Sequence, residues 1–198
     1  MEQFKFLADL YKDIYFWLAG VTPGEHTCIS HYKKYDKVVW LKIKNKIIEL
    51  ENKKELTFYE KEFLKCKYKG KAYRVIRYNY RNKGHVHEVN YYQSCSKNIN
   101  AVKNVNIYGE KILIELNAKQ NSYAIDIFKL LFFMIKNEII RLEDFKKYNF
   151  LNLEKYECEK EVVIPLTDDN IVNISIVDFE ENRKIDLPKS KWYRNKLY

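Results

Sequence analysis

The residues with the clearest capacity for chemistry are cations placed among tyrosines in the middle of the chain. They are Lys65, Lys67, Lys69, Lys71, Arg74, Arg77 and Arg81. The four lysines stand at alternate positions, so on a strand they lie on one side. There they can follow a phosphate backbone while exposed tyrosines stack on bases. The same pattern is typical of a solvated sheet face whose lysines prevent edge pairing. The run is a candidate surface for nucleic acid or for an acidic protein.

A second group of cations surrounds aromatic residues near the end of the sequence. It consists of Lys189, Lys191, Trp192, Tyr193, Arg194 and Lys196. A basic aromatic arm of this kind can reach into a groove or lie along DNA. The alternative is that Trp192 and Tyr193 pack back onto the domain, since an exposed tryptophan usually needs a partner.

Histidines and cysteines offer a weaker pattern. His26, Cys28 and His31 form H-x-C-x-x-H, and His85 and His87 would share one face of a strand. Metal sites need three or four converging ligands, and this spacing matches no zinc signature. We therefore expect no bound metal and no cofactor.

One arrangement of charged residues resembles a nuclease site. Asp36, Glu51 and Lys53 follow the acidic-acidic-lysine order of restriction-type nucleases, in which carboxylates hold magnesium and the lysine orients water. In a chain this rich in lysine and acids, such a triplet arises easily by chance. Phosphate loops, nucleophile elbows and H-E-x-x-H motifs are absent from the sequence. We expect no catalytic residues, and a metal-dependent nuclease remains the alternative.

The charge is segregated along the chain. Residues 31–111 carry 20 Lys and Arg against 8 Asp and Glu, whereas the first 30 residues and residues 112–181 are both net acidic. An AT-rich genome enriches Lys, Asn, Ile and Tyr and explains part of the net charge of +9. It does not explain the segregation, which favours a partner attracted to a positive surface.

The elements that must position these residues follow from apolar spacing. Intervals of three and four residues from Phe4 to Leu18 predict a helix, ended by Gly20 and Pro23-Gly24. Residues 38–50 fit a strand or a hairpin, with a helix left open. Thr57 and Glu60 resemble a capping box that starts a helix through Leu64.

Most of the remaining sequence predicts strands and turns. We expect a three-stranded meander over residues 65–69, 72–80 and 85–93, and hairpins turning at residues 108–110 and 167–170. A long buried helix is expected from about 121 to 140. The fold class is α+β: an antiparallel sheet of several hairpins packed against an N-terminal helix and a central helix. Residues 1–182 form one domain, and residues 183–198 form the basic aromatic arm.

Composition and targeting signals bound the cellular setting. With 198 residues, of which 46% are hydrophobic, the chain has material for one core. The N-terminus lacks the features of a signal peptide, and no apolar stretch is long enough to span a membrane. The four cysteines are scattered, as is usual for reduced thiols. We expect a cytoplasmic protein.

In length, one-domain plan, lack of a targeting segment and Lys-, Asn- and Tyr-rich text, the chain resembles the small host-takeover proteins of phages that infect AT-rich Gram-positive bacteria. Among these it is most similar to the staphylococcal phage inhibitors that bind the primary sigma factor of host RNA polymerase. The resemblance implies a non-enzymatic binder of the promoter-recognition domain of sigma, acting in the host cytoplasm, with a basic surface or arm that touches upstream DNA. A nucleic-acid-binding protein without a protein target, or another phage inhibitor such as an anti-CRISPR protein, remains the alternative.

Overall fold

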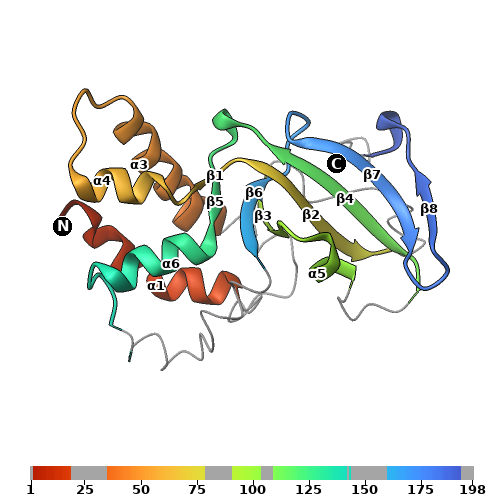
Figure 1. The fold of residues 1–198 in the computed structure, drawn as a ribbon, viewed down its shortest axis with the longest axis horizontal. Helices are drawn as coiled ribbons and strands as arrows, with labels where there is room; N and C mark the ends of the chain where they lie inside the picture. The colour runs from red at the N-terminus through yellow and green to blue at the C-terminus, as the bar shows by residue number, and fades with distance from the viewer. Residues whose placement is uncertain are drawn as a thin grey trace.

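The chain forms a helical lobe and one antiparallel sheet of eight strands (Figure 1). The helical lobe consists of the helices within residues 2–64 and the helix over residues 127–136. The computed structural model describes residues 2–18, 35–78, 91–103, 109–141, 143 and 160–192. The helices are α1 (Lys5–Leu18), α3 (Leu41–Glu51), α4 (Phe58–Leu64), α5 (Ile99–Lys103) and α6 (Ile127–Lys136), with short turns η1 (Glu2–Phe4), η2 (Asp36–Trp40), η3 (Gln120–Ser122) and η4 (Lys189–Lys191). The strands are β1 (Lys67–Tyr68), β2 (Gly70–Arg77), β3 (Tyr92–Ser96), β4 (Lys111–Ala118), β5 (Ala124–Asp126), β6 (Glu161–Pro165), β7 (Ile171–Asp178) and β8 (Arg183–Asp186). The expected α+β class is confirmed.

The N-terminal helix forms where the apolar spacing predicts it. Leu7, Leu10, Ile14 and Trp17 of α1 are all buried, because residues three and four apart share one face of a helix. This face packs into the helical lobe, where the Trp17 ring meets the Trp40 ring edge-on at 4.7 Å.

Residues 36–51 are helical and form neither a strand nor a hairpin. A π-helical turn, η2, leads directly into α3. Val39, Ile43, Ile47 and Leu50 are completely buried, and their spacing of four, four and three residues fits a helix with one apolar stripe. This stripe decides between the two readings that the sequence left open.

The capping box at the start of α4 is confirmed. The Glu60 backbone N–H donates to Thr57 Oγ1 at 3.3 Å, and the Thr57 backbone N–H donates to Glu60 Oε2 at 2.7 Å. The helix carries Phe63 into an aromatic cluster with Phe4 and Phe133, whose ring centroids lie 5.0–5.5 Å apart. Phe4 is the last residue of η1, directly before α1, so this cluster joins the start of the N-terminal helix to α4 and α6.

The central helix is shorter than expected. Residues 124–126 form β5, and α6 begins only at Ile127, where the Asp126 side chain accepts a hydrogen bond from the backbone N–H of Lys129 at 3.2 Å. The helical expectation from residue 121 was therefore wrong at its start. The reason is that Asp126, and not Asn121 or Ser122, provides the N-cap.

The strands do not pair as the local hairpins predicted. The order across the sheet is β1-β5-β6-β3-β2-β4-β7-β8, so β6 and β7 are not neighbours although only five residues separate them. The main partner of β2 is β4, with eight residue pairs, while β3 meets β2 at a single pair. The hairpin at residues 167–170 and the pairing of the first two strands of the meander were therefore wrong, because these strands pair with partners distant in sequence. Residues 79–90, which hold the second turn of the meander and most of its third strand, lie outside the described residues. The second strand of the hairpin expected across residues 108–110 is present as β4, whereas residues 104–108, which would supply its first strand and turn, lie outside the described residues.

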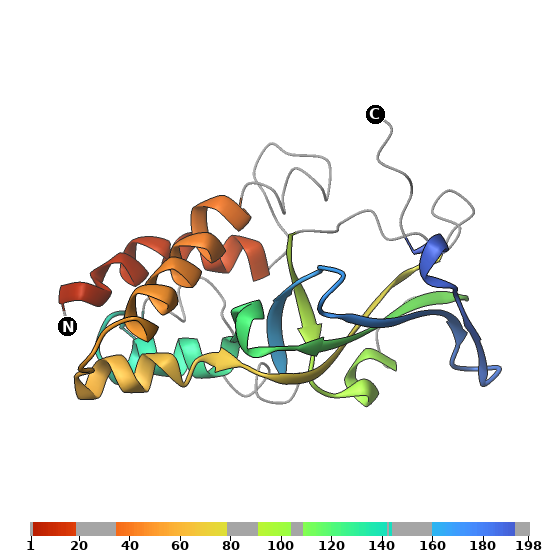
Figure 2. The same cartoon turned by 90° about the horizontal axis from the view of Figure 1, so that it is seen from above.

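The sheet curls back on itself where β1 meets β2. Only Lys69 separates these strands, so Tyr68 and Gly70 lie within about 7 Å of each other. In a flat sheet the four steps from β1 to β2 would span roughly 19 Å. Gly70 permits the bend with a φ of +135°, and a Cβ there would lie 3.1 Å from the Tyr68 hydroxyl. Figures 1 and 2 show β3 and β6 turned away from the long β2–β4–β7 ribbon.

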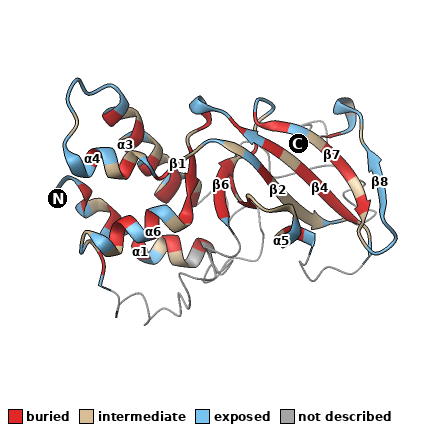
Figure 3. Ribbon diagram, in the orientation of Figure 1, coloured by how far each residue is buried: buried red, intermediate tan, exposed pale blue. Residues whose placement is uncertain are grey.

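The curled sheet encloses a second apolar core. Ala72, Cys95, Ile114, Ile164 and Ile174 come from five different strands and meet inside it. The opposite face of β2 and β4 is covered in part by α5 through Val102. Figure 3 shows buried residues running along β4 and β7 while β8 is exposed throughout.

Residues 183–192 pack as part of the domain, although the sequence predicted an arm there. Arg183–Asp186 is not an arm but β8, paired with β7. Trp192 is 4% exposed and joins the core inside the sheet, and its Nε1 donates to the carbonyl of Leu187 at 2.7 Å. The domain therefore extends at least to Trp192. Tyr193, Arg194 and Lys196 lie outside the described residues.

Candidate functional site

The alternating lysines of the basic run do not share a face. Lys65 is the C-cap of α4, where it bonds to Glu62. Lys67 belongs to β1, and its Nζ lies 2.5 Å from Glu51 Oε1 and 4.5 Å from the centre of the Tyr123 ring. Its side chain is 7% exposed, so Lys67 holds α3 to the sheet and is not available to a partner.

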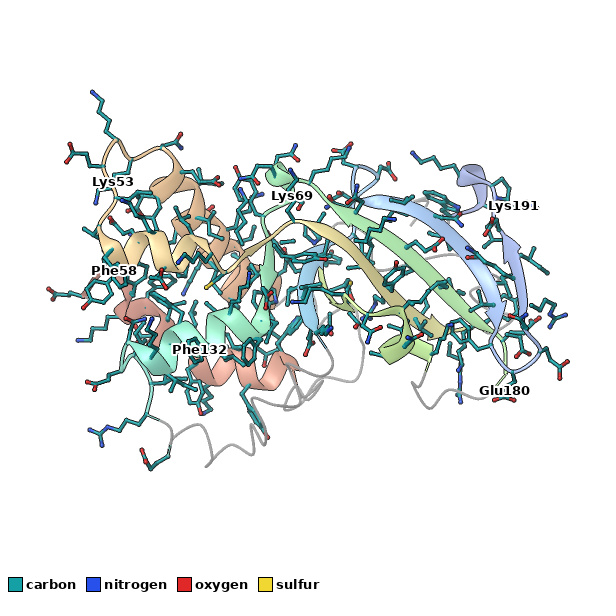
Figure 4. All side chains as sticks on the ribbon, viewed as in Figure 1. Lys53, Phe58, Lys69, Phe132, Glu180 and Lys191 are labelled. Carbon is teal, nitrogen blue, oxygen red and sulfur yellow. The ribbon has the colours of Figure 1, made fainter. Side chains whose placement is uncertain are left out.

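The remaining cations of this run are divided between the two faces of β2. Lys71 and Arg77 are exposed and share one face, because they are an even number of residues apart. Arg74 points to the other face and donates to the carbonyl of Ser94 at 2.7 Å. Lys69 is exposed at the bend (Figure 4). No ion pair between described residues involves Lys69 or Lys71. Arg81 lies outside the described residues.

The cations near the C-terminus lie at the other end of the sheet from the helical lobe (Figure 4). Lys189 and Lys191 are exposed on η4, and Lys189 Nζ lies 5.6 Å from the centre of the Trp192 ring. Trp192 itself is buried and cannot stack on a base. Among the described residues, the exposed cations of the two candidate groups therefore lie apart, with Lys69 and Lys71 in one place and Lys189 and Lys191 in another.

The nuclease-like triplet is not assembled. Asp36 and Glu51 lie at opposite ends of the continuous η2–α3 helix, roughly 20 Å apart along its axis. Lys53 bonds to Glu60 at 2.8 Å. Asp36 Oδ1 instead accepts a hydrogen bond from the backbone N–H of Tyr92 at 2.8 Å, and burial raises the pKa of its carboxyl. This carboxylate joins the helical lobe to β3.

The described residues also form no cluster of metal ligands. Among the described residues, no three His, Cys, Asp or Glu side chains come together. The four histidines and Cys28 lie outside those residues. Cys66 and Cys95 are buried free thiols, and burial raises the pKa of both, to about 12 for Cys95.

A groove lies between α4 and α6, and the sequence reasoning missed it. It encloses about 370 Å³. Its apolar surface consists of Cys66, Phe128, Phe132 and Phe133, and its rim consists of Glu62, Lys65, Lys129, Lys136 and Asn137. Three of the four charged groups on the rim are lysines.

Phe132 is the residue that marks this groove. Its side chain is 50% exposed, and its ring stacks on that of Phe128 at 6.2 Å with planes 17° apart. The core-facing side of α6 is already supplied by Leu130, Leu131 and Met134. Phe128 and Phe132 are therefore not needed to fill the core. The signal was in the sequence: a ten-residue helix apolar around most of its circumference has more apolar surface than one core contact needs.

The rim of the groove carries a net positive charge, and ion pairs hold part of that charge in place. Glu62 bonds to Lys65 and lies 3.9 Å from Lys136, and these contacts lower the pKa of its carboxyl, with the Lys65 bond as the main cause. Glu62 therefore stays ionised and neutralises one lysine. The rim keeps a surplus of positive charge beside an exposed aromatic ring.

Further exposed aromatic rings lie on the same lobe. Phe58 and Tyr59 at the start of α4 are 65% and 41% exposed, and their rings lie 5.7 Å apart. Figure 4 shows Phe58 and Phe132 both on the helical lobe. Exposed apolar side chains gathered in this way mark interaction surfaces more often than single ones do.

Comparison with protein-family models, with curated proteins and with solved structures finds no match to this chain. None of the helices in the described ranges is both long and apolar enough to cross a membrane.

Proposed function

We propose that this protein is a non-enzymatic phage inhibitor that binds the primary sigma factor of host RNA polymerase in the host cytoplasm, with the α4–α6 groove as its binding site. The observation that carries the proposal is the exposed Phe132 in an apolar groove with a lysine-rich rim. The identity of the partner rests on the sequence resemblance. The groove supports the weaker statement that the partner is a protein.

The chemistry of the groove selects a particular kind of segment. An amphipathic helix can place its apolar anchors against Phe128 and Phe132, and this is a common way of filling a groove between helices. Acidic residues beside those anchors would meet Lys65, Lys129 and Lys136. Long-range attraction to the positive rim would also raise the association rate.

Nucleic acid makes only auxiliary contacts to the protein in this proposed complex. Lys69, Lys71, Lys189 and Lys191 are exposed, but they form separate small groups and not a continuous stripe. They suit auxiliary contacts to upstream DNA once the protein partner is bound. A large sequence-independent affinity for DNA alone is less well supported, because it requires several phosphate contacts at once.

The direct test is calorimetry with purified primary sigma factor, followed by transcription from a sigma-dependent promoter. We expect wild-type protein to bind and inhibit, and Phe132→Ala to weaken both by at least about tenfold, since an exposed aromatic anchor is a typical hot spot. The matched control is Val172→Ala, because Val172 is 62% exposed on β7, away from the groove. Its binding should be unchanged.

The contrary outcomes are separable. Absence of binding between wild-type protein and sigma would refute the partner. Binding that survives Phe132→Ala and the double substitution of Lys129 and Lys136 to Glu would keep the partner but exclude the groove.

A further inference from the structure

Strand β8 ends the sheet, and its outer edge has no neighbour among the described strands. All four of its residues are exposed, and Ile185 at its centre is 49% exposed. Figures 1 and 2 both show β8 as the outermost strand, with no other described element beyond it. An edge of this kind offers unpaired backbone groups to another strand.

The hydrogen-bond pattern shows which backbone groups are offered. The Leu187 N–H donates to the Ile174 carbonyl at 2.9 Å, and the register pairs Ile185 with Ile176 and Lys184 with Val177. Backbone groups alternate in direction along a strand. The N–H and C=O of Arg183, Ile185 and Leu187 therefore point to β7, while those of Lys184 and Asp186 point outward.

The sequence of β8 is complementary to itself in one antiparallel register. If Ile185 faces Ile185 of a second copy across a two-fold axis, Lys184 of each chain lies opposite Asp186 of the other. Lys184 and Asp186 are then the hydrogen-bonded pairs, so each pair exchanges two backbone hydrogen bonds. The two isoleucines form the non-hydrogen-bonded pair, in which side chains approach most closely.

The neighbouring registers are unfavourable. If the two-fold axis passes through Lys184 and not Ile185, the Lys184 side chains of the two copies lie opposite each other and repel. A shift by a single residue would place side chains from opposite faces of the sheet against each other, which a continuous ladder does not allow. Only the register centred on Ile185 combines outward backbone groups, opposite charges and an apolar contact.

We propose that this protein forms a symmetric dimer in which the β8 strands of two copies pair antiparallel about Ile185. Lys184 and Asp186 lie 3.6 Å apart on one face of the strand, where Asn173 Nδ2 donates to Asp186 at 2.8 Å and Lys184 lies 3.2 Å from Glu115. In the dimer these groups form one network across both copies. The helical lobe lies at the far end of the sheet, so both α4–α6 grooves stay open (Figure 1).

The size of the contact sets its strength. Two four-residue strands bury less than the 1,200 Å² or so of a standard interface, so dimerisation is weak and depends on concentration. Sedimentation velocity and small-angle scattering of wild-type protein, from roughly 10 μM to roughly 1 mM, should show reversible dimers elongated along the sheet.

Charge reversal at the two facing positions provides the decisive experiment. Lys184→Asp places two aspartates opposite each other, and Asp186→Lys does the same with lysines. Each variant alone should dimerise at least about tenfold more weakly, because two attractive pairs become repulsive. An equimolar mixture of the two variants restores every opposite-charge pair, so it should form heterodimers. Glu180→Lys is the matched control, since Glu180 is exposed in the turn outside the interface.

The results separate the proposal from its competitors. A wild-type protein that stays monomeric at the highest concentration would overturn it and would show that Lys184 and Asp186 only guard the edge. Dimers that persist in Lys184→Asp at wild-type strength would place the interface elsewhere, and so would failure of the mixture to associate while both variants melt like the wild type.

Discussion

The carboxylate of Glu60 is almost completely buried, and it lies 2.8 Å from the ammonium group of Lys53, seven residues earlier in the chain. The same carboxylate accepts the backbone hydrogen bond of the capping box. One side chain thus closes the turn between α3 and α4 and starts α4.

This arrangement predicts a stability that depends on acid pH. The bond from Lys53, and secondly that from Thr57, lower the pKa of Glu60 from 4.5 to about 2. Because the pKa is lower in the folded state, the ionised carboxylate stabilises the fold above pH 4.5, and this contribution is lost as the pH falls towards 2. Urea unfolding at intervals from pH 6 to pH 2.5 measures it. Glu60→Gln should flatten the profile in this range, whereas Glu49→Gln, at an exposed position, should leave it unchanged.

Trp192 predicts a large loss of stability when it is truncated. Its indole is buried in the core within the sheet and bonded to Leu187, so Trp192→Ala should cost roughly 3 kcal/mol or more of unfolding free energy. Urea denaturation gives the value. Lys191→Ala, at the exposed neighbouring position, should change it by less than about 0.5 kcal/mol. Equal stability of the two variants would contradict the buried placement of Trp192.

The lysines of the basic run should separate into structural and binding residues. Lys67→Ala removes the contacts to Glu51 and Tyr123 and should lower the melting temperature. Lys69→Ala and Lys71→Ala should not lower it. If these two lysines contact phosphates near the protein partner, each substitution reduces the slope of log affinity against log salt by about 0.9. Titrations of sigma-bound promoter DNA at several salt concentrations measure that slope, and an unchanged slope would show that both are only solvated.

The buried thiols should be chemically silent in the native protein. Thiol reagents need the thiolate, and burial raises the pKa of Cys66 and Cys95. Peptide mapping after alkylation at pH 8 should therefore find these two cysteines unmodified until denaturant is added. Rapid labelling of Cys66 in native protein would mean that the α4–α6 groove opens.

Local sequence patterns predicted the helices and their caps better than the pairing of strands. The spacing around Ile14 and the Thr57–Glu60 box report interactions within a few residues, and both are confirmed. The partner of β2 is β4, whose first residue lies more than 30 positions further along the chain. Turn residues favour neighbouring strands, but here the bend at Gly70 and the curl of the sheet choose distant ones.

The same limitation applied to the candidate site. Alternation on a strand placed Lys65, Lys67, Lys69 and Lys71 on one side, although the helix expected through Leu64 and the break expected after residue 69 already divided them. In the structure Lys65 caps α4, Lys67 lies on β1 and Lys71 lies on β2, so no single strand carries all four. The apolar excess of α6 was visible in the sequence. Its exposure was not, because only the packing of α4 against Phe133 shows which side of α6 is already covered.

The order of strands has a consequence for synthesis on the ribosome. β6 lies between β5 and β3, and β7 lies beside β4, so the sheet lacks its connecting strands until residues 161–178 have been made. Helices α1, α3, α4 and α6 precede this point and can associate first, leaving the β2–β4 pair exposed on the nascent chain. We expect a chain ending at residue 160 to be cleaved by protease between residues 91 and 118 while α1 and α3 resist. The completion of the fold is then a late event, tied to the last fifth of the protein.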